Sequence, residues 1–253
     1  MLAIERRNQI ANLVQQNGNV TISELTALFQ VSVETIRKDL MYLEENRALM
    51  RTHGGAVRFH TAIRPLNARK REFAAEKQEL CRYALRFIEN GDIIAIDAGS
   101  TAVELAKLLT SSFSKLTVVT HSLEIFNLLS ENSGFQLILC GGSFNRTESA
   151  FTGCLTTDMI YKLHVAKSFI FASNISLHSG ITEYHEDMVP IQRAYIHIAD
   201  QVFILANSEK YEKSALLQTC PLDPDFFYIT DSGLPAETAA QYAEQGYSII
   251  NRP

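Results

Sequence analysis

Apolar positions recur with a helical period at the beginning of the chain. Ile10, Leu13 and Val14 share one face of a helix that we predict over residues 5–16. Asn17-Gly18 follows, a pair typical of a helix C-terminus because glycine adopts the left-handed conformation readily. The pattern therefore predicts one amphipathic helix that packs on a core by a single face.

A second, shorter helix is predicted directly afterwards. Thr21-Ile22-Ser23-Glu24 has the form of a capping box, in which the threonine and glutamate side chains satisfy free amides at a helix start. We expect this helix to run through Phe29, with Leu25 and Leu28 facing inward.

The third predicted helix combines an apolar stripe with an exposed basic face. Ser32 is placed to cap its N-terminus. The stripe recurs at i, i+4 and i+7 and consists of Ile36, Leu40 and Leu43. The exposed positions that could reach DNA are Thr35, Arg37, Lys38 and Tyr42. Arginine in a major groove can grip guanine with two hydrogen bonds. Taken alone, the helix fits an ordinary solvated basic face equally well.

A β-hairpin is predicted after this helix. Residues 49–52 and 56–59 flank His53-Gly54-Gly55, and glycine supplies the positive φ that a tight turn needs. Three helices and a hairpin within sixty residues indicate a winged helix-turn-helix. Arg51 and His53 are then the wing residues placed to contact the DNA backbone or the minor groove.

Two motifs in this region are specific in composition and spacing. They are Thr35-Ile36-Arg37-Lys38-Asp39-Leu40 and Arg51-Thr52-His53-Gly54-Gly55-Ala56. Together they resemble the DNA-binding domain of DeoR-type bacterial transcriptional regulators. Arg47 departs from the pattern, since that family has a glycine at the end of the recognition helix. The resemblance implies a sequence-specific regulator that binds an operator in double-stranded DNA.

Beyond residue 90 the pattern changes to short apolar runs that alternate with helices. We predict strands over residues 93–97, 116–120, 136–140, 168–172, 202–207, 227–230 and 247–250. Helices are predicted over 72–88, 102–109, 123–129, 155–163, 188–199 and 236–245. Near-continuous apolar strands between helices indicate a mostly parallel, doubly wound sheet covered on both faces. The expected fold is α/β, with a winged helix-turn-helix over 1–58, a linker over 59–71 and an effector-sensing domain over 72–253.

Polar residues and glycines gather at the carboxyl ends of these strands, where ligands bind in such sheets. Glycine lets the backbone approach an anion, and a helix N-terminus adds a favourable dipole. The residues that we expect to bind an effector are Asp97, Gly99, Ser100, Thr101, Thr120, His121, Gly141, Gly142, Glu186 and Lys210. A capped strand-to-helix turn without a ligand is the alternative for the Asp97 loop alone.

The same positions match the effector domain of the DeoR family, so the resemblance covers nearly the whole chain. It implies a fold similar to ribose-5-phosphate isomerase and the CoA-transferases, used to sense a phosphorylated sugar. It also implies a repressor of a carbohydrate-catabolism operon. Five positions depart from the family pattern and bear on the identity of the ligand: His121, Ala166, Phe171, Asn174 and Asn207.

Charge is distributed unevenly along the chain. The 253 residues carry a net charge of −5, which as an average argues against nucleic-acid binding. Residues 1–71 nevertheless contain 11 basic and 6 acidic residues, and the remainder contains 12 basic and 22 acidic ones. A basic N-terminal segment followed by an acidic remainder is what we expect when the N-terminal segment contacts DNA phosphates.

Cysteine usage and hydropathy narrow the class further. The four cysteines lie far apart without a C-x-x-C pair, so we expect buried free thiols in a reducing cytoplasm. The seven histidines show no metal-binding spacing, and we expect no metal and no cofactor. There is neither a signal peptide nor an apolar run of about 18 residues, so we expect no membrane association.

An enzyme is the alternative function. A sugar-phosphate isomerase-like domain with an accessory DNA-binding domain would use Asp97, Glu186 or Lys210 in acid–base roles. Ala166 and Asn207 remove carboxylates from the family pattern, so we expect a regulator without catalysis. One winged helix buries little surface, and reading two half-sites requires a symmetric oligomer. We therefore expect a homodimer or homotetramer assembled through the effector domain.

Overall fold

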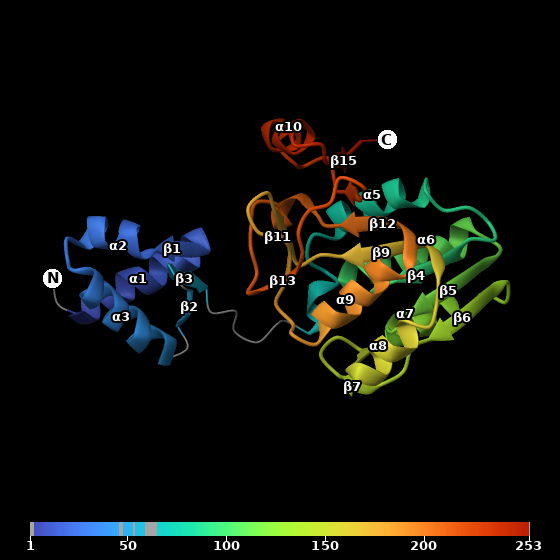
Figure 1. Ribbon diagram of the computed structural model, residues 1–253, viewed down its shortest axis with the longest axis horizontal. Helices are drawn as coiled ribbons and strands as arrows, with labels where there is room; N and C mark the ends of the chain where they lie inside the picture. Colours follow the sequence, from blue (N-terminus) through green and yellow to red (C-terminus); the bar gives the residue numbers. More distant parts are fainter. Residues whose placement is uncertain (1–2, 46–47, 53, 59–64, 253) are drawn as a thin grey trace. The chain divides into compact units, whose positions relative to one another are not determined.

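The computed structural model describes residues 3–45, 48–52, 54–58 and 65–252. The chain divides into two units (Figure 1), which we call the head unit, residues 1–64, and the sheet unit, residues 65–253. No helix in the described ranges is long and apolar enough to cross a membrane.

The head unit contains three helices and a small antiparallel sheet. The helices are α1 (Ala3–Asn17), α2 (Ile22–Phe29) and α3 (Val33–Glu45). The strands β1 (Asn19–Thr21), β2 (Leu49–Thr52) and β3 (Gly55–Arg58) pair in the order β1-β3-β2. The three predicted helices are confirmed. The hairpin is confirmed as well, although its second strand begins at Gly55 and not at residue 56, and residues 53 and 59 lie outside the described ranges. The third strand, β1, was not predicted because three residues are too short for an alternating pattern to show.

The predicted helix caps in the head unit are confirmed. Thr21 Oγ1 accepts a bond from the amide of Glu24 at 3.2 Å, and a carboxylate oxygen of Glu24 accepts one from the amide of Thr21 at 2.7 Å. Ser32 Oγ accepts a bond from the amide of Thr35 at 3.2 Å. Both caps satisfy amides that a helix start leaves free, which fixes where α2 and α3 begin.

One predicted core residue of the head unit is wrong. Leu25 is buried, but Leu28 is 60% exposed. The side of α2 that packs on the core follows Ile22, Leu25 and Phe29, which recur at i, i+3 and i+7. Leu28 lies beside this stripe, and an eight-residue helix that packs along one stripe leaves it in solvent.

The sheet unit is built on seven parallel strands. They are β4 (Ile93–Ile96), β5 (Leu116–Thr120), β6 (Phe135–Leu139), β9 (Val165–Phe171), β12 (Ala199–Leu205), β14 (Phe227–Ile229) and β15 (Ser248–Ile250). Their order in the sheet is β15-β14-β12-β9-β4-β5-β6. Each predicted strand is confirmed, within three residues at either end. The strand order reverses between β4 and β9, and in such folds this switch point is where ligands bind.

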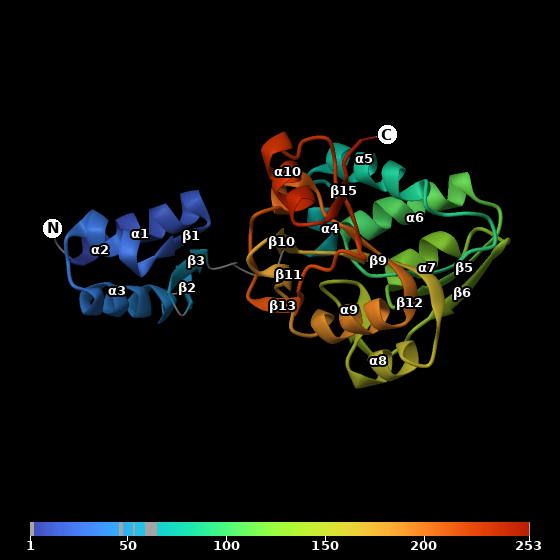
Figure 2. The same ribbon diagram turned by 45° about the horizontal axis from the view of Figure 1, so that its top comes forward.

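Helices cover both faces of this sheet. One face packs on α5 (Ala74–Leu85), α6 (Ser100–Ser112) and α7 (Leu123–Leu129), and the other on α8 (Cys154–Ile160), α9 (Met188–His197) and α10 (Ala236–Glu244). Alternate residues of β4 serve the two cores, with Ile94 and Ile96 on one side and Ala95 on the other. Figure 2 shows α5 and α6 above the sheet and α8 and α9 below it. The predicted doubly wound α/β architecture is confirmed.

Several short elements were not predicted. They are α4 (Leu66–Arg69), the hairpin β7 (Ser143–Asn145) and β8 (Ala150–Thr152), the antiparallel strands β10 (Asn174–Ser176), β11 (Gly180–Glu183) and β13 (Leu217–Cys220), and a 3-10 turn, η1 (Ser208–Lys210). Helix α4 falls within the segment that the sequence assigned to a linker. Leu66 is buried there, and its amide donates to the carbonyl of Thr147 at 2.9 Å, so α4 packs on the rest of the sheet unit.

Candidate nucleic-acid interface and ligand site

Helix α3 presents its basic side chains to solvent. Ile36 and Leu40 are buried in the head core, whereas Arg37 and Lys38 are exposed and Thr35 is half-exposed. Asp39 is the exception among the polar residues of this motif, since it is only 1% exposed. The helix therefore has a solvent-exposed basic side, and Asp39 is its buried charged residue.

Two arginines of α1 hold Asp39. The Nε atoms of Arg6 and Arg7 lie 2.6 Å and 2.8 Å from its two carboxylate oxygens. The guanidinium carbon of Arg7 also lies 4.0 Å from the centre of the Tyr42 ring, a cation–π contact. Tyr42 is 45% exposed and lies beside the positive charge of Arg7. The sequence analysis assigned no role to Arg7.

The wing is tied to the end of α3. Arg51 Nε lies 2.7 Å from a carboxylate oxygen of Glu44, and the Arg51 amide donates to the other oxygen at 2.9 Å. These bonds from Arg51 hold the pKa of Glu44 below its usual value. Arg51 therefore positions β2 against α3 as well as carrying charge. His53 and Arg47 lie outside the described residues.

In the sheet unit, Asp97 occupies the switch point. It follows β4, its amide donates to the carbonyl of Phe169 on β9 at 3.1 Å, and it is 1% exposed. One carboxylate oxygen accepts from the amide of Ala98 at 2.8 Å, and the other from the amide of Phe171 at 3.4 Å. Burial raises the pKa of Asp97 to about 7, although these bonds oppose the rise.

Gln192 of α9 lies between Asp97 and a second buried carboxylate. Its Nε2 is 3.1 Å from Asp97 Oδ2 and 3.4 Å from Glu183 Oε2. Its Oε1 accepts a bond from Thr219 Oγ1 at 2.8 Å, which fixes the orientation of the amide. The predicted Glu186 lies three residues beyond Glu183 in an exposed turn, outside this cluster. Sequence reasoning missed Glu183, whose only signal was its position in a short strand after Gly180.

His121 lies on the other side of Asp97. The side chain is fully buried, its Nδ1 is 3.2 Å from the hydroxyl of Tyr195, and its Nε2 is 3.8 Å from Asp97 Oδ1 without a hydrogen bond among the described residues. Burial lowers the pKa of His121 to about 3, so the ring is neutral. The Nε2 of this neutral ring is therefore a buried polar atom without a hydrogen-bond partner among the described residues.

The Gly99 loop brings the N-terminus of α6 to the same edge. Gly99 has φ +133°, a conformation that side-chain-bearing residues rarely adopt, and it precedes the first helical residue. Ser100 and Thr101 are buried in the first turn, whose amides have no acceptor within the helix. This arrangement suits an anion.

Lys210 reaches the switch point from the end of β12. Its ammonium donates to the carbonyl of Ala172 at 2.7 Å. The 3-10 turn that carries it is held by Asp231, which accepts bonds from the Ser208 amide at 2.6 Å and the Ser208 hydroxyl at 2.8 Å. Burial lowers the pKa of Lys210 to about 8.

Two of the expected residues have structural roles at this edge. Thr120 is fully buried, and its hydroxyl donates to the carbonyl of Ile96 at 2.8 Å, which links the ends of β5 and β4. A Cβ added at Gly142 would lie 2.1 Å from Thr156 Oγ1, so this glycine allows α8 to pack. Nothing lies within 4 Å of a Cβ added at Gly141, which therefore borders open space.

A buried carboxylate links the switch-point region to α4. Glu148 is 3% exposed, forms an ion pair with Arg69, and lies 3.0 Å from His185 Nε2. The amide of His185 in turn donates to Glu183 at 3.2 Å. Burial raises the pKa of Glu148, but His185 and Arg69 outweigh it and hold the pKa below the usual value.

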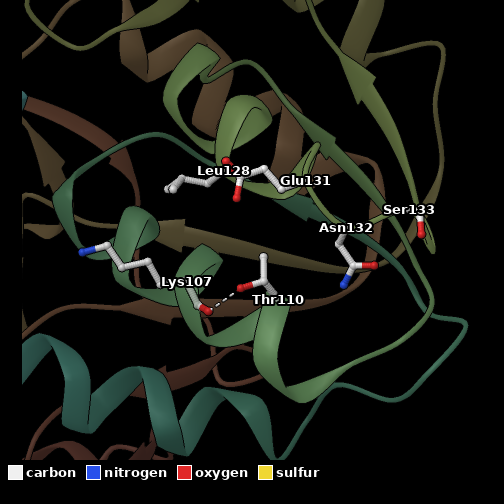
Figure 3. Close-up of a pocket in the computed structure, with 6 residues that line it drawn as sticks. All are labelled: Lys107, Thr110, Leu128, Glu131, Asn132 and Ser133. Carbon is white, nitrogen blue, oxygen red and sulfur yellow. Dashed lines mark hydrogen bonds between the residues drawn. The ribbon is translucent and has the colours of Figure 1, made fainter.

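A surface depression lies at the opposite end of α6 (Figure 3). It measures about 410 Å³ and is lined by Lys107, Thr110, Leu128, Glu131, Asn132 and Ser133. The Thr110 hydroxyl donates a hydrogen bond to the carbonyl of Lys107 at 2.8 Å. The depression is open and lies at the amino edge of the sheet, away from Asp97, so we assign the candidate ligand site to the switch point.

Comparison with protein families divides the chain as the fold does. Residues 6–62 match the family described as the DeoR-like helix-turn-helix domain. Residues 72–232 match the family described as the DeoR C-terminal sensor domain. The two matches span both units.

Individual relatives align along nearly the whole chain. The transcriptional repressor GlcR of Bacillus subtilis is 32% identical over 229 residues, covering 90% of this chain and 88% of that protein. The L-fucose operon activator of Haemophilus influenzae is 31% identical over 242 residues, covering 95% and 96%. A ribose 5-phosphate isomerase A from Methanocaldococcus jannaschii superposes with a TM-score of 0.41 at 13% identity over 55% of each chain, a likeness too weak to carry an argument about function.

Proposed function

The chain belongs to the DeoR family of helix-turn-helix transcriptional regulators, and from that premise we propose that it represses a carbohydrate-catabolism operon under the control of a phosphorylated sugar. The relatives are regulators of transcription, and this chain is a regulator and not an enzyme. Repression and the class of sugar are the parts of the proposal that go beyond the family match. GlcR is named as a repressor, whereas the Haemophilus influenzae relative is named as the activator of an L-fucose operon.

The exposed face of α3 supports the DNA-binding part of the proposal. Arg37 and Lys38 extend from a helix whose opposite side is fixed in the head core. A helix held this way can enter a major groove, with Arg37 on a base edge and Lys38 on a base or phosphate. Thr35 and Tyr42 lie on the same helix and Ser32 caps its start, and Arg51 and His53 are assigned to the wing contacts.

The switch point supports the effector part. Asp97 and Glu183 are buried acceptors for sugar hydroxyls, joined by the Gln192 amide. The first turn of α6 and the ammonium of Lys210 supply donors for a phosphate. The single observation that carries the proposal is this pairing of carboxyl acceptors with an anion-binding helix terminus at one strand edge.

Self-association completes the proposed mechanism. A symmetric oligomer presents two recognition helices to two half-sites about one turn of DNA apart, roughly 34 Å. We assign this assembly, a homodimer or a homotetramer, to the sheet unit, because the head unit has a small core and an exposed α3 that must stay free for DNA.

A ligand screen followed by DNA binding tests the proposal. Sugar phosphates, free sugars and inorganic phosphate are each added to the full chain, and melting temperature is recorded, since a ligand that binds only the folded state raises it. We expect a sugar phosphate to raise it and to release a DNA duplex selected from a random library. Asp97→Ala and Lys210→Ala should keep DNA binding but lose the response. Release by both variants at the wild-type ligand concentration would remove these residues from the site.

A further inference from the structure

Helix α8 and the β7–β8 hairpin carry a group of large apolar side chains that are exposed to solvent. Leu155 on α8 is 69% exposed, more than any other large apolar residue in the described part of the sheet unit. Met159 on α8, Tyr161 directly after it and Phe144 on β7 are exposed as well. We call these four side chains the α8 surface. The sequence analysis assigned no role to them.

The hairpin and the helix form one continuous surface. Phe144 pairs with Phe151 across the hairpin, and the centres of their rings lie 5.4 Å apart. Gly153 alone separates β8 from α8. The Thr156 hydroxyl donates to the carbonyl of Gly141 at 3.1 Å, so the first turn of α8 lies against the segment that leads into β7. Figure 1 shows β7 beside α8, and in Figure 2 α8 lies beyond α9 on the outer side of the sheet unit.

Backbone hydrogen bonds hold the hairpin in place. The amide of Phe151 donates to the carbonyl of His121 at 2.8 Å, and the amide of Leu123 donates to the carbonyl of Ser149 at 3.0 Å. Both bonds join the hairpin to the turn between β5 and α7. A surface whose backbone is already fixed loses little conformational entropy when a partner covers it, and this favours binding.

The composition of the α8 surface is typical of a contact between proteins. Aromatic residues, methionine and arginine are enriched at such contacts relative to the rest of a protein surface. Phe144, Met159 and Tyr161 belong to these types, and the exposed Arg146 follows Phe144 closely in the hairpin turn. Exposed apolar side chains that lie together and are bordered by polar ones mark a surface that a partner covers.

The charges that border the α8 surface identify a second copy of the chain as the partner. Arg146, Asp158 and Lys162 are exposed there, and none of them forms an ion pair with another described residue. One acid and two bases are therefore left to pair across a contact. When a twofold axis relates two copies, each surface meets its own equivalent, so the acid of either copy faces the bases of the other. The surface thus complements itself in charge as well as in apolar character.

We propose that the α8 surface binds the α8 surface of a second copy of this chain about a twofold axis. The inference rests on the self-association in the proposed function, and it names the surface that carries it. Each apolar side chain is used twice in such a contact. A stable contact buries about 800 Å² on each partner, so it also covers the charged residues that border the apolar ones.

Sedimentation velocity of the full chain over a series of concentrations tests the apolar part. Leu155→Glu places a charge in the contact twice. We expect it to halve the mass of the wild-type assembly and to raise the dissociation constant at least about a hundredfold. Leu216→Glu changes another strongly exposed leucine of the sheet unit, 61% exposed and outside the α8 surface, and should keep the wild-type mass. Both leucines lie in solvent in the single chain, so far-ultraviolet circular dichroism should show the same fold in all three proteins.

A charge reversal tests the electrostatic part. Asp158→Lys makes all three bordering charges positive, so two copies should repel each other and associate more weakly at low salt. Association should recover in about 1 M salt, where the screening length is about 3 Å. Glu131→Lys, an exposed acid after α7, is the matched control and should associate as the wild type does.

The outcomes separate this contact from the rest of the proposed function. An assembly of wild-type mass in both Leu155→Glu and Asp158→Lys would overturn the contact and leave self-association standing. A wild-type chain that sediments as a monomer, alone and on DNA, would overturn both. Failure of every sugar phosphate to release DNA, with Leu155→Glu at half the wild-type mass, would count against the proposed effector and support the contact.

Discussion

Asp39 and Arg6 form a buried ion pair between α3 and α1, with Arg6 Nε 2.6 Å from Asp39 Oδ2. Asp39 directly follows Arg37 and Lys38, whose side chains are exposed to solvent. The carboxylate thus sets the rotation of α3 about its axis, because only one orientation places Asp39 on the arginines of α1. The pair therefore helps to fix which side chains of α3 face solvent.

Replacing Asp39 with alanine should destabilise the head unit. The change leaves the guanidinium of Arg6 buried without its partner, and breaking a buried pair on one side costs about 3–5 kcal/mol. We expect faster hydrogen exchange of the α3 amides and loss of DNA binding, while α5 and α6 exchange as in the wild type. Glu34→Ala, an exposed acid on the same helix, is the control. Equal protection of α3 in both variants would show that the pair contributes little.

Replacing Arg37 with alanine should remove sequence preference and keep the fold. Arg37 is exposed, so its loss leaves the head core intact. A bidentate arginine–guanine contact is worth about 1–3 kcal/mol of discrimination. The ratio of affinities for selected and scrambled duplexes, measured at one fixed salt concentration, should fall by about tenfold or more. Arg82→Ala, an exposed arginine of α5, should leave that ratio unchanged. A preserved ratio in Arg37→Ala would exclude Arg37 from base recognition.

Asp97 and His121 should give opposite pH dependences of stability. Burial raises the pKa of Asp97 from 3.8 to about 7, so its contribution to stability is full below pH 4 and is lost as pH rises to 7. Burial lowers the pKa of His121 from 6.5 to about 3, so its contribution is present above pH 6.5 and is lost as pH falls. Between about pH 4 and 6.5, therefore, the Asp97 contribution lowers stability as pH rises, whereas the His121 contribution raises it.

Single substitutions separate the two slopes. Asp97→Asn leaves the His121 slope alone, so its melting temperature should rise with pH through this window more steeply than that of the wild type. His121→Gln leaves the Asp97 slope, so its melting temperature should fall as pH rises. Thermal unfolding at half-unit steps of pH measures both. Parallel profiles for the three proteins would mean that neither group titrates differently on unfolding.

Alanine at the two adjacent glycines after β6 should have different consequences. At Gly142 the new Cβ meets Thr156 Oγ1 at 2.1 Å and the Thr152 carbonyl at 2.7 Å, and overpacking of this kind costs about 1–3 kcal/mol. At Gly141 it meets nothing, so stability should be unchanged. If a ligand occupies the space beside Gly141, the Gly141→Ala variant should bind it more weakly. Denaturant midpoints and ligand-induced melting shifts measure the two effects, and equal losses of stability would contradict the assignment.

The parts of the fold that follow from local patterns could be predicted from sequence. Strands such as β4 are continuous apolar runs, and the caps at Thr21 and Ser32 depend on neighbours three residues away. Leu28 shows where this reasoning fails, because only the packing of α2 on its neighbours decides which side of a short helix is buried. The strands β10, β11 and β13 are held by pairing with one another, which no local pattern records.

The candidate site divides in the same way. Asp97 and the Gly99 loop follow β4 directly, and Lys210 lies in the turn after β12, so the rule that strand ends meet at one edge was enough to predict them together. Gln192 lies within a helix, and Glu183 lies in a short strand of a second sheet. Their side chains reach the site through contacts between segments as far as 95 residues apart, as between Gln192 and Asp97. Glu186 is only three residues from Glu183 in the sequence, but its side chain is exposed to solvent.

The four cysteines differ in accessibility, against the expectation that all are buried. Cys81 and Cys140 are buried, Cys220 is half-buried, and Cys154 at the start of α8 is exposed. Burial raises the pKa of Cys140 and of Cys220 to about 11, which keeps both thiols protonated and slow to react. The native sequence therefore supplies a single position for a maleimide dye. Energy transfer between dyes on Cys154 would test whether subunits assemble on DNA, without any engineered cysteine.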